Sequence, residues 1–429
     1  MSGPVANNIF RSSGVVAAAA GGLSWQPVVT ASTLSASAGN GYWINTTSNA
    51  CTITLPSAAT AGDQIIFVDY ARTWGTNEII IDSNGLNFQG EPDTYTVDYD
   101  TSGQALNLVY SGATIGWTPS SDIVNALEPV QPPTQKAIFA YGFNSSNASV
   151  SMSNLMNSSG VIATDVSGVG TARFALAAAT YGGDKAVFGY GRHTGSTGVS
   201  LKNLVNNSGV VAADVTGVGT GRFDLAAASY GVGLAIFAYG ADGADPNYTA
   251  VSNLVNTSGV IASDVSAVGT ARRSLAAVGY GGDKAIFAYG NTGSRVNTRN
   301  LVSNSGVVAS DASGAGTARE NLAATSYGGL AAGTSIFAYG AAAAYYSMSN
   351  KVSNSGVLAS DVTGVGTARN DLTATNYGGD KGAFAYGING AGKLSIKNLV
   401  NSSGVIGSDV TGVGTQRGNN AAAGFSFST

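Results

Sequence analysis

The sequence predicts an all-β protein in two parts, a β-sandwich or jelly roll followed by a six-bladed β-propeller. The main observation is a repeat of 47 to 50 residues between residues 135 and 429. Repeats of about this length form propellers or solenoids, in which each unit buries its apolar face against its neighbours. Two residues mark the repeat six times each, an arginine (Arg173, Arg222, Arg272, Arg319, Arg369 and Arg417) and a tyrosine (Tyr141, Tyr190, Tyr239, Tyr289, Tyr339 and Tyr386).

Each unit holds four runs of strand length, which is the content of one propeller blade. Residues 176–181 and 185–190 are two such runs separated by Gly-Gly-Asp, and they predict a hairpin. A second hairpin follows, with Asn-x-Ser-Gly as its turn. We expect the alanine-rich first strand to lie innermost, because only small side chains fit where blades converge on a central channel.

Residues 135–429 resemble the kelch repeat family. Its units share an arginine that enters a small-residue strand, a glycine pair, an aromatic and aliphatic second strand that ends in glycine, and a third turn rich in Asp and Asn. The resemblance implies a kelch-like propeller and, as one function, a kelch-type protein–protein interaction adaptor.

The first unit lacks its first strand, and an extra run of the same kind follows the last unit. The first unit opens at Lys136 with no small-residue strand ahead of it, whereas the small-residue run Ala421-Ala-Ala-Gly-Phe follows the last arginine with no second strand after it. We therefore expect residues 421–425 to form the innermost strand of the unit whose second strand is residues 136–141. An unclosed ring would leave a strand edge exposed, which folds avoid.

Residues 24–120 differ from the repeats in composition and hold all four tryptophans. Six runs separated by Gly, Asn, Pro and Asp turns predict a β-sandwich or jelly roll here. The runs are residues 42–45, 51–56, 64–70, 78–82, 95–98 and 105–110. Residues 1–23 predict an arm that orders on a neighbouring subunit, with a flexible tail as the alternative, and residues 121–134 predict a stiff proline-containing linker.

Part of this first domain resembles a small β domain of bacteriophage tail-fibre and virion-appendage proteins. The resemblance rests on Thr-Ile-Thr-Leu-Pro-Ser-Ala-Ala-Thr-Ala-Gly-Asp at residues 52–63 and on Trp-Gly-Thr-Asn-Glu-Ile-Ile-Ile-Asp at residues 74–82. It spans roughly residues 40–118 and implies a virion protein that docks to the particle through this domain.

Composition excludes several classes of function. Charged residues are 10% of the chain and the net charge is −4, so clustered Lys and Arg for binding nucleic acid are missing. Cys51 is the only cysteine, which rules out an internal disulfide and a cysteine-based metal site. The N-terminal residues show no basic n-region and no apolar run long enough for a signal peptide or a membrane span, so we expect a soluble protein made without a secretory signal.

The inventory of reactive side chains predicts no enzyme, no cofactor and no metal. His193 is the only histidine, and a Ser-His, Cys-His or copper site would need it. Aspartates recur eight residues before the arginines, and a residue repeated in every unit indicates structure. We expect most of the six arginines to be at least half buried between units, bonded to backbone carbonyls or to the aspartates, and the aspartates to fix loops or contact the arginines. Calcium sites are the less favoured alternative because Asp-Val-x-Gly offers too few oxygen ligands. The aspartates are Asp165, Asp214, Asp264, Asp311, Asp361 and Asp409.

The connection between the second and third strands varies in length and content from unit to unit. Variation on a fixed scaffold is how binding faces are built, and drift in unconstrained surface loops is the alternative. The candidate ligand-binding residues in these loops are Phe143, Arg192, His193, Tyr248, Arg295, Arg299, Tyr345, Tyr346 and Lys393.

These observations predict a non-enzymatic structural or adhesive bacteriophage virion protein, a tail fibre, spike or capsid fibre. The N-terminal part would dock to other virion structural proteins, the propeller would present a host-binding face to a surface glycan or protein, and copies would associate as a trimer. The kelch-type adaptor is the alternative. A propeller glycan hydrolase is disfavoured because no carboxylate pair is evident on the unequal loops.

Overall fold

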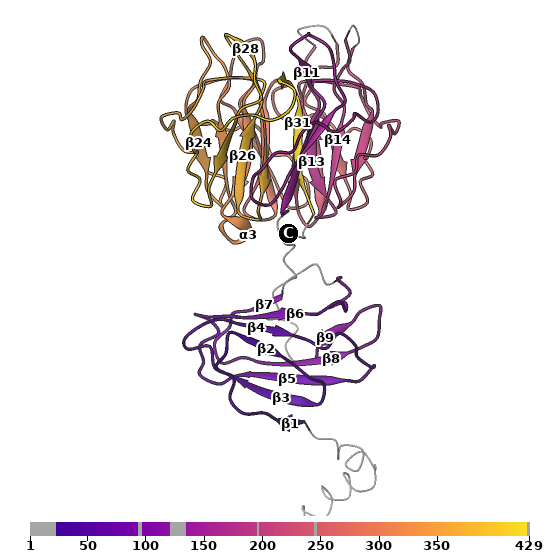
Figure 1. The fold of residues 1–429 in the computed structure, drawn as a ribbon, viewed down its shortest axis with the longest axis vertical. Helices are drawn as coiled ribbons and strands as arrows, with labels where there is room; N and C mark the ends of the chain where they lie inside the picture. The colour runs from indigo at the N-terminus through magenta and orange to yellow at the C-terminus, as the bar shows by residue number, and fades with distance from the viewer. Residues whose placement is uncertain (1–22, 93–96, 121–133, 195–196, 244–246, 427–429) are drawn as a thin grey trace, which may run out of the picture. The chain divides into compact units, whose positions relative to one another are not determined.

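The computed structural model describes residues 23–92, 97–120, 134–194, 197–243 and 247–426 (Figure 1). The protein is all-β, as predicted, and α3 (Gly329–Ala332) is the one helix in the described ranges. The chain divides into two compact units, residues 1–131 and residues 132–429, called unit 1 and unit 2 below. The predicted N-terminal arm and most of the predicted linker lie outside the described residues.

Unit 1 consists of two sheets around one core. One sheet has the strand order β1-β3-β5-β8-β9 and the other β2-β4-β6-β7. Inward side chains of both sheets, with Trp74 and Trp117 fully buried among them, form a single apolar cluster. The strands are β1 (Ser24–Trp25), β2 (Thr33–Ser35), β3 (Asn40–Ile44), β4 (Cys51–Thr54), β5 (Gln64–Asp69), β6 (Ile79–Asp82), β7 (Val97–Tyr99), β8 (Ala105–Tyr110) and β9 (Trp117–Pro119).

Two packed sheets were expected, but the jelly-roll part of the expectation is wrong. A jelly roll is antiparallel, whereas the pairs β1/β3, β3/β5, β2/β4 and β4/β6 are parallel. The reason is the path of the chain from β1 to β6, which passes from one sheet to the other after every strand. Each of these strands therefore runs parallel to the preceding strand of its own sheet.

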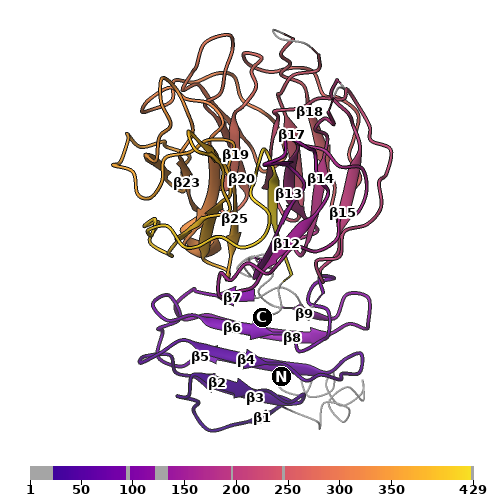
Figure 2. The same cartoon turned by 45° about the horizontal axis from the view of Figure 1, so that its top comes forward.

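Unit 2 contains six three-stranded antiparallel sheets in its described residues, each built from an inner, a middle and an outer strand. Figure 2 shows β13, β14 and β15 in this order from the centre outward. The six sheets, inner strand first, are β31 (Ala421–Phe425), β10 (Lys136–Ala140) and β12 (Ser153–Met156); β13 (Ala177–Tyr181), β14 (Lys185–Gly189) and β15 (Lys202–Val205); β16 (Ala226–Tyr230), β17 (Leu234–Ala238) and β18 (Ser252–Val255); β19 (Ala276–Tyr280), β20 (Lys284–Ala288) and β21 (Arg299–Val302); β22 (Ala323–Tyr327), β23 (Thr334–Ala338) and β24 (Ser349–Val352); and β25 (Thr373–Tyr377), β26 (Lys381–Ala385) and β29 (Lys397–Val400). Four short strands lie in the connections, β11 (Phe143–Asn144) paired with β30 (Arg417–Gly418), and β27 (Ile388–Asn389) paired with β28 (Gly392–Lys393).

The predicted pairing of the C-terminal strand with the first unit is confirmed. β31 pairs antiparallel with β10, with Lys136 opposite Phe425 and Ala140 opposite Ala421. β31 also contacts the inner strands β13 and β25 of the two neighbouring sheets, and Figure 1 shows it beside β13. The inner strands thus contact one another in the order β31, β13, β16, β19, β22, β25 and back to β31.

The residue types of the strands follow from where they pack. In the middle strands the last four residues are buried, so these strands read as continuous apolar runs such as Ala-Ile-Phe-Ala. Inner strands are rich in alanine because each packs against the inner strands of two other sheets. Between neighbouring sheets, a middle-strand phenylalanine packs edge-on against the marker tyrosine of the sheet before it, as Phe287 does against Tyr239 at 5.4 Å between ring centroids.

Four strands per unit were expected, but the fourth run is reduced to two isolated bridges per sheet, such as Arg299↔Ala312 and Val302↔Val308. An asparagine of the outer strand explains the interruption. The Nδ2 of Asn300 donates to the carbonyl of Ala309 at 3.0 Å and to Oδ1 of Asp311 at 2.9 Å. The side chain therefore takes up a carbonyl that a regular ladder would use.

Each marker arginine is fully buried, with 0% exposure, so the prediction of at least half burial is confirmed. Arg272 shows the arrangement that four of the six share: its Nε donates to the carbonyl of Tyr289, its Nη1 to that of Thr270, and its Nη2 to Oδ1 of Asn300 at 2.7 Å. In Arg222 and Arg417 the buried Nε has no partner among the described residues. The guanidinium of Arg272 also lies over the ring of Tyr239 in the neighbouring sheet, 4.2 Å from the centroid. The six Arg–Asn pairs are Arg173–Asn203, Arg222–Asn253, Arg272–Asn300, Arg319–Asn350, Arg369–Asn398 and Arg417–Asn154.

The recurring aspartates fix loops, as expected. Oδ2 of Asp311 accepts from the backbone N–H of Thr270 at 2.9 Å, and its Oδ1 lies 4.0 Å from Nη1 of Arg272. Gly269, just before this threonine, has φ +78°, and a Cβ there would collide with the carboxylate. The hydrogen bonds from threonine and asparagine lower the pKa of Asp311 despite its partial burial. This arrangement explains why Gly-Thr recurs ahead of each arginine.

Replacement of Arg272 with alanine tests this network. We expect Arg272→Ala to lower the free energy of unfolding by about 1 to 3 kcal/mol, because Asn300 and the carbonyl of Tyr289 would stay buried without a partner. The control is Lys284→Ala, whose ammonium pairs with Asp283 at the exposed surface and should change stability by less than about 1 kcal/mol. Urea unfolding of both variants measures the difference, and equal effects would contradict the account.

Candidate functional site

A closed circle of backbone hydrogen bonds lies at the end of unit 2 where the inner strands begin. In each sheet the residue two positions before the inner strand has a positive φ, between 50° and 56°, and its N–H donates to the carbonyl of the same residue in the sheet before it. The distances are 2.8 to 3.0 Å. We call these residues the rim ring: Ala175, Asp224, Ser274, Asn321, Asp371 and Asn419, with Ala175 bonding back to Asn419.

The left-handed backbone of the rim ring accounts for part of its residue composition. Asn and Asp tolerate the left-handed backbone better than other residues with a Cβ, and they occupy four of the six positions. Ala175 and Ser274 adopt the same conformation although it disfavours them, so the circle of hydrogen bonds holds them there.

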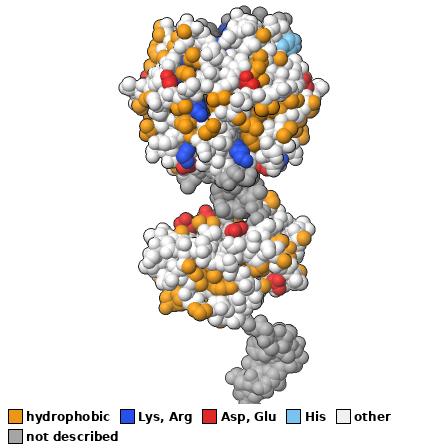
Figure 3. Space-filling view, viewed as in Figure 1, with side chains coloured by type: hydrophobic (Ala, Val, Ile, Leu, Met, Phe, Trp, Pro, Cys, Tyr) orange, Lys and Arg blue, Asp and Glu red, His pale blue; other side chains and the backbone are white. Residues whose placement is uncertain are grey.

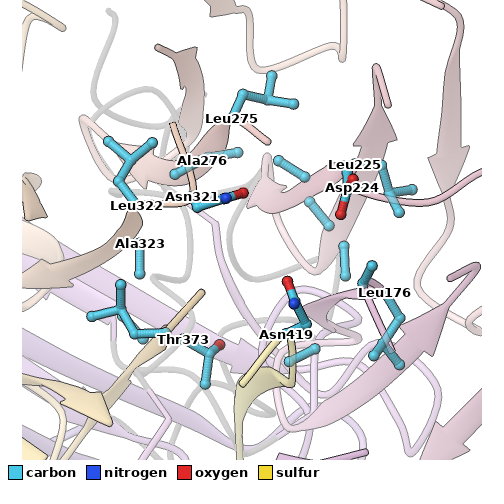
Figure 4. Close-up of a pocket in the computed structure, with 18 of the residues that line it drawn as sticks. Leu176, Asp224, Leu225, Leu275, Ala276, Asn321, Leu322, Ala323, Thr373 and Asn419 are labelled. Carbon is cyan, nitrogen blue, oxygen red and sulfur yellow. The ribbon is translucent and has the colours of Figure 1, made fainter. Parts of the chain in front are cut away.

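A cavity of about 130 Å³ opens inside the rim ring and is called the central cavity. All six sheets contribute to it: below the rim ring it is lined by a leucine from each of five sheets and by the alanines of the inner strands. Figure 4 shows the side chains of Asp224, Asn321 and Asn419 directed into the same space. The central cavity thus has an oxygen-rich rim, and its accessible lining is more polar than apolar although alanines and leucines surround it.

The rim is acidic. Burial raises the pKa of Asp371 to about 7, and the nearby charges of Asp224 and Glu320 add to the increase while Lys393 opposes it. Asp224 lies 3.9 Å from Nη1 of Arg273, so its charge is partly compensated. No hydrogen bond or ion pair to the Asp371 carboxylate is present among the described residues.

Asn420 breaks the repeat next to the rim ring. The equivalent positions in the other sheets are leucines, Leu176, Leu225, Leu275, Leu322 and Leu372, packed in apolar clusters. Asn420 lines the central cavity and is only 5% exposed. Neither atom of its amide has a hydrogen-bond partner in the described part of the chain, although buried amides normally have one.

The loops predicted to bind ligand follow the middle strands, whose last residues pair with the first residues of the inner strands. These loops therefore lie at the same end of unit 2 as the rim ring, and in Figure 1 β11 and β28 are at the end opposite α3. Tyr345 is 40% exposed in its loop, and Tyr346 and His193 are half-buried. Arg295 is exposed and pairs with Glu320 at 2.9 Å.

Other predicted loop residues are engaged within the protein. Arg192 lies between the rings of Phe174 and Phe223, 5.0 and 4.2 Å from their centroids. Tyr248 lies under the guanidinium of Arg273. Both are half-buried, so they present only part of their surface to a ligand.

Two more predicted residues link neighbouring sheets. Lys393 donates to Oδ1 of Asn147 at 2.8 Å and lies over the ring of Phe143. Arg299 is not in a loop at all: it is the first residue of β21 and its guanidinium donates to the carbonyl of Gly356 in the next sheet. The prediction that Arg299 lies in a ligand-binding loop is therefore wrong, because its side chain links two sheets.

The rim ring itself was missed from the sequence. Its residues stand two positions after the marker arginines, and five of the six are Asp, Asn or Ser. In five of the six units leucine follows directly. A small polar residue at a fixed place before an apolar strand was the available signal.

Comparison with models of known protein families and with curated protein sequences gives no match to this chain. Among the described residues no group of three or more His, Cys, Asp or Glu side chains could hold a metal ion. The same ranges contain no helix long and apolar enough to cross a membrane. The visible surface of unit 2 in Figure 3 carries charged side chains singly rather than in a basic patch.

The raised pKa of Asp371 predicts an unusual dependence of stability on pH. The folded protein holds this proton more tightly than the unfolded chain, whose carboxyl has the ordinary pKa of 3.8. The ionised carboxyl therefore costs stability that grows as pH rises from about 4 to about 7. We expect Asp371→Asn, which keeps a residue that tolerates positive φ, to raise the melting temperature at pH 8 and to leave it unchanged at pH 3.

Thermal unfolding followed by circular dichroism at both pH values measures this effect, with Asp283→Asn at an exposed turn as the control. A shift of the same size at both pH values, or destabilisation at pH 8, would show that Asp371 is not held in a raised-pKa environment.

Proposed function

We propose that unit 2 is a six-bladed, kelch-like β-propeller closed by β31, and that the protein is a non-enzymatic adhesive component of a bacteriophage virion. The closed order of inner-strand contacts and the closed circle of the rim ring support the propeller. One observation supports the adhesive function most: the network of buried arginines repeats in all six sheets, whereas the loops around the central cavity differ from sheet to sheet. We call the repeated arginine network and its strands the frame. Such a frame keeps the loops in place while their contacts vary.

Unit 1 is proposed to dock to other virion proteins and to bring copies together. Its surface carries a stacked pair of exposed tryptophans, Trp25 at 46% and Trp43 at 36%, with ring centroids 4.4 Å apart. Exposed tryptophan is enriched where proteins associate. The resemblance of residues 40–118 to virion-appendage domains supports the same role.

The adaptor alternative would use the same loop face with a cellular partner.

The glycan hydrolase alternative gains one observation from the structure. Asp224 and Asp371 line one cavity, and the pKa of Asp371 is raised, as that of a general acid must be. An assay for reducing ends released from bacterial surface polysaccharide distinguishes hydrolysis from adhesion.

Immunogold electron microscopy tests the virion location. Antibodies against unit 2 are applied to particles purified from cultures that produce the full chain. We expect label on the appendages or capsid surface of intact particles. Label confined to the soluble cell fraction, with clean particles, would overturn the virion proposal and favour the adaptor.

The proposed trimer has its own test. Light scattering of the purified full chain should give three times the monomer mass, and the double variant Trp25→Ala/Trp43→Ala should shift this toward the monomer. The control is Tyr70→Ala, which removes another exposed aromatic side chain of unit 1. A monomeric wild-type protein contradicts the trimer, and a double variant that stays trimeric contradicts the role of the tryptophan pair.

A further inference from the structure

Arg192 departs from the repeat at the loop face of unit 2. It follows Tyr190-Gly191 directly, and the residues at the equivalent position of the other five sheets are uncharged. Each of those residues pairs with the segment after a marker arginine, as Arg192 pairs with Phe174, so the backbone arrangement forms without a cation. The frame therefore does not need the charge of Arg192. The five equivalent residues are Phe143, Ala241, Asn291, Ala341 and Ile388.

The guanidinium of Arg192 is held in place but keeps two nitrogens open to solvent. It lies between the rings of Phe174 and Phe223, and stacking on aromatic rings fixes the plane of a guanidinium. In the described part of the chain this guanidinium has no hydrogen bond and no ion pair, and only its Nε is shut off from solvent. Its Nη1 and Nη2 can therefore donate to a ligand.

A second cation, Lys393, lies on the other side of the loop that begins at Phe143. Its Nζ donates to Oδ1 of Asn147 at 2.8 Å and lies 4.8 Å from the centroid of the Phe143 ring. That ring contacts the ring of Phe174 at 4.8 Å between centroids. Lys393, Phe143, Phe174 and Arg192 thus form one continuous row over the connections of three neighbouring sheets, which we call the cation row.

The cation row carries positive charge without a paired carboxylate. Two other arginines at this end of unit 2 each have such a partner; the pairs are Arg273–Asp224 at 3.9 Å and Arg295–Glu320 at 2.9 Å. No ion pair of Arg192 or Lys393 is present within the described ranges. The charge of Lys393 lowers the pKa of the buried Asp371, but burial outweighs it and the pKa is about 7, so the negative charge of Asp371 is incomplete at neutral pH.

Hydroxyl and amide groups border the cation row. The hydroxyls of Ser149 and Thr194 meet at 3.1 Å between the loops of two sheets, and Asn147 and Thr194 are exposed. Hydroxyl and amide groups both donate and accept hydrogen bonds, as the hydroxyls of a sugar do. The planar fork of an arginine matches the two oxygens of a carboxylate. These groups therefore fit a sugar that carries a carboxylate.

Two other anionic partners fit less well. Nucleic acid is held by many cations along its backbone, whereas the cation row offers two. An acidic peptide offers carboxylates but few hydroxyls, so it would leave the hydroxyl groups beside the row without partners.

We propose that the cation row binds an acidic glycan, with one uronic-acid carboxylate on Nη1 and Nη2 of Arg192 and the carboxylate of another sugar at Lys393. Sugar hydroxyls would bond to Ser149 and Thr194, and the aromatic rings of the row position the two cations. This inference rests on the proposed function, since it names the class of ligand recognised at the proposed host-binding face.

Isothermal titration of the full chain at pH 7 and low salt tests the site, with trigalacturonate and trimannuronate as probes. We expect saturable binding of at least one of them at one probe per chain. The fully methyl-esterified form of the bound probe is neutral and should bind at least about tenfold more weakly, as expected for loss of charged hydrogen bonds. Arg192→Gln should weaken binding by a similar factor. Arg192→Lys should lie in between, because lysine keeps the charge but not the planar fork.

Arg295→Gln is the matched control. It removes one positive charge from the same face, but from an arginine that already pairs with Glu320. We expect this variant to bind the probe like the wild type. A loss as large as that of Arg192→Gln would show that net charge, and not the cation row, holds the glycan.

A second arm separates a glycan from an acidic peptide. Acetyl-triglutamate amide carries three carboxylates without sugar hydroxyls and should bind at least about tenfold more weakly than the uronate. Equal or tighter binding of the peptide would assign the cation row to an acidic peptide and overturn the glycan proposal.

Three further outcomes would overturn the proposal: no binding of either uronate by the wild type, equal binding of the methyl ester, and unchanged affinity in Arg192→Gln. If Arg192→Gln fails to fold by circular dichroism, Lys393→Gln takes its place with the same expected loss. Because the titration uses purified protein, failure of uronate binding leaves the immunogold result unaffected, and the reverse is also true.

Discussion

The fully buried marker arginine is the interaction on which unit 2 depends. Its guanidinium bonds to the outer-strand asparagine and to backbone carbonyls of its own sheet, and lies over a tyrosine of the sheet before it. A charge buried without such partners would be strongly destabilising. Burial lowers the pKa of Arg272, and the neighbouring Tyr239 and Asp311 counteract this change. Each sheet thus completes the environment of the next arginine.

This coupling explains why the ends of the chain meet. The arginine before β31, Arg417, bonds to Asn154 near the start of unit 2, and Asp165 accepts from Thr415. Lys397 likewise donates to the carbonyl of Gly160. The same contacts that join consecutive sheets elsewhere therefore join the last segment to the first. With the frame fixed in this way, the rim-ring side chains and the loops can differ from sheet to sheet.

Much of this frame could be predicted from the sequence because it repeats. Period, residue size and turn residues located the inner and middle strands, the buried arginines and the pairing of β31 with β10. The fourth strand was overpredicted, because its apolar run gives no sign that Asn300 would take up the carbonyl of Ala309. The parallel pairs of unit 1 were also missed, since strand patterns do not reveal which sheet each strand joins.

The candidate site was harder to predict for the opposite reason. Its residues differ between units, and the importance of Asp371 or Asn420 depends on burial and on neighbours far away in the sequence. Loop residues chosen for charge or aromaticity proved to be partly engaged within the protein, as Arg192 and Lys393 show. Repetition therefore reveals structure, whereas departures from it point to the site only once the fold is known.

The central claim is that the two ends of unit 2 close it by supplying one sheet, and truncation tests this claim most directly. A chain that lacks residues 419–429 loses β31, and a control that lacks only residues 427–429 keeps it. Scanning calorimetry of both and of the full chain compares their melting. The account predicts that the longer truncation lowers the melting temperature of unit 2 as a whole and promotes aggregation, while the control melts like the full chain. Unchanged melting after removal of residues 419–429 would contradict closure.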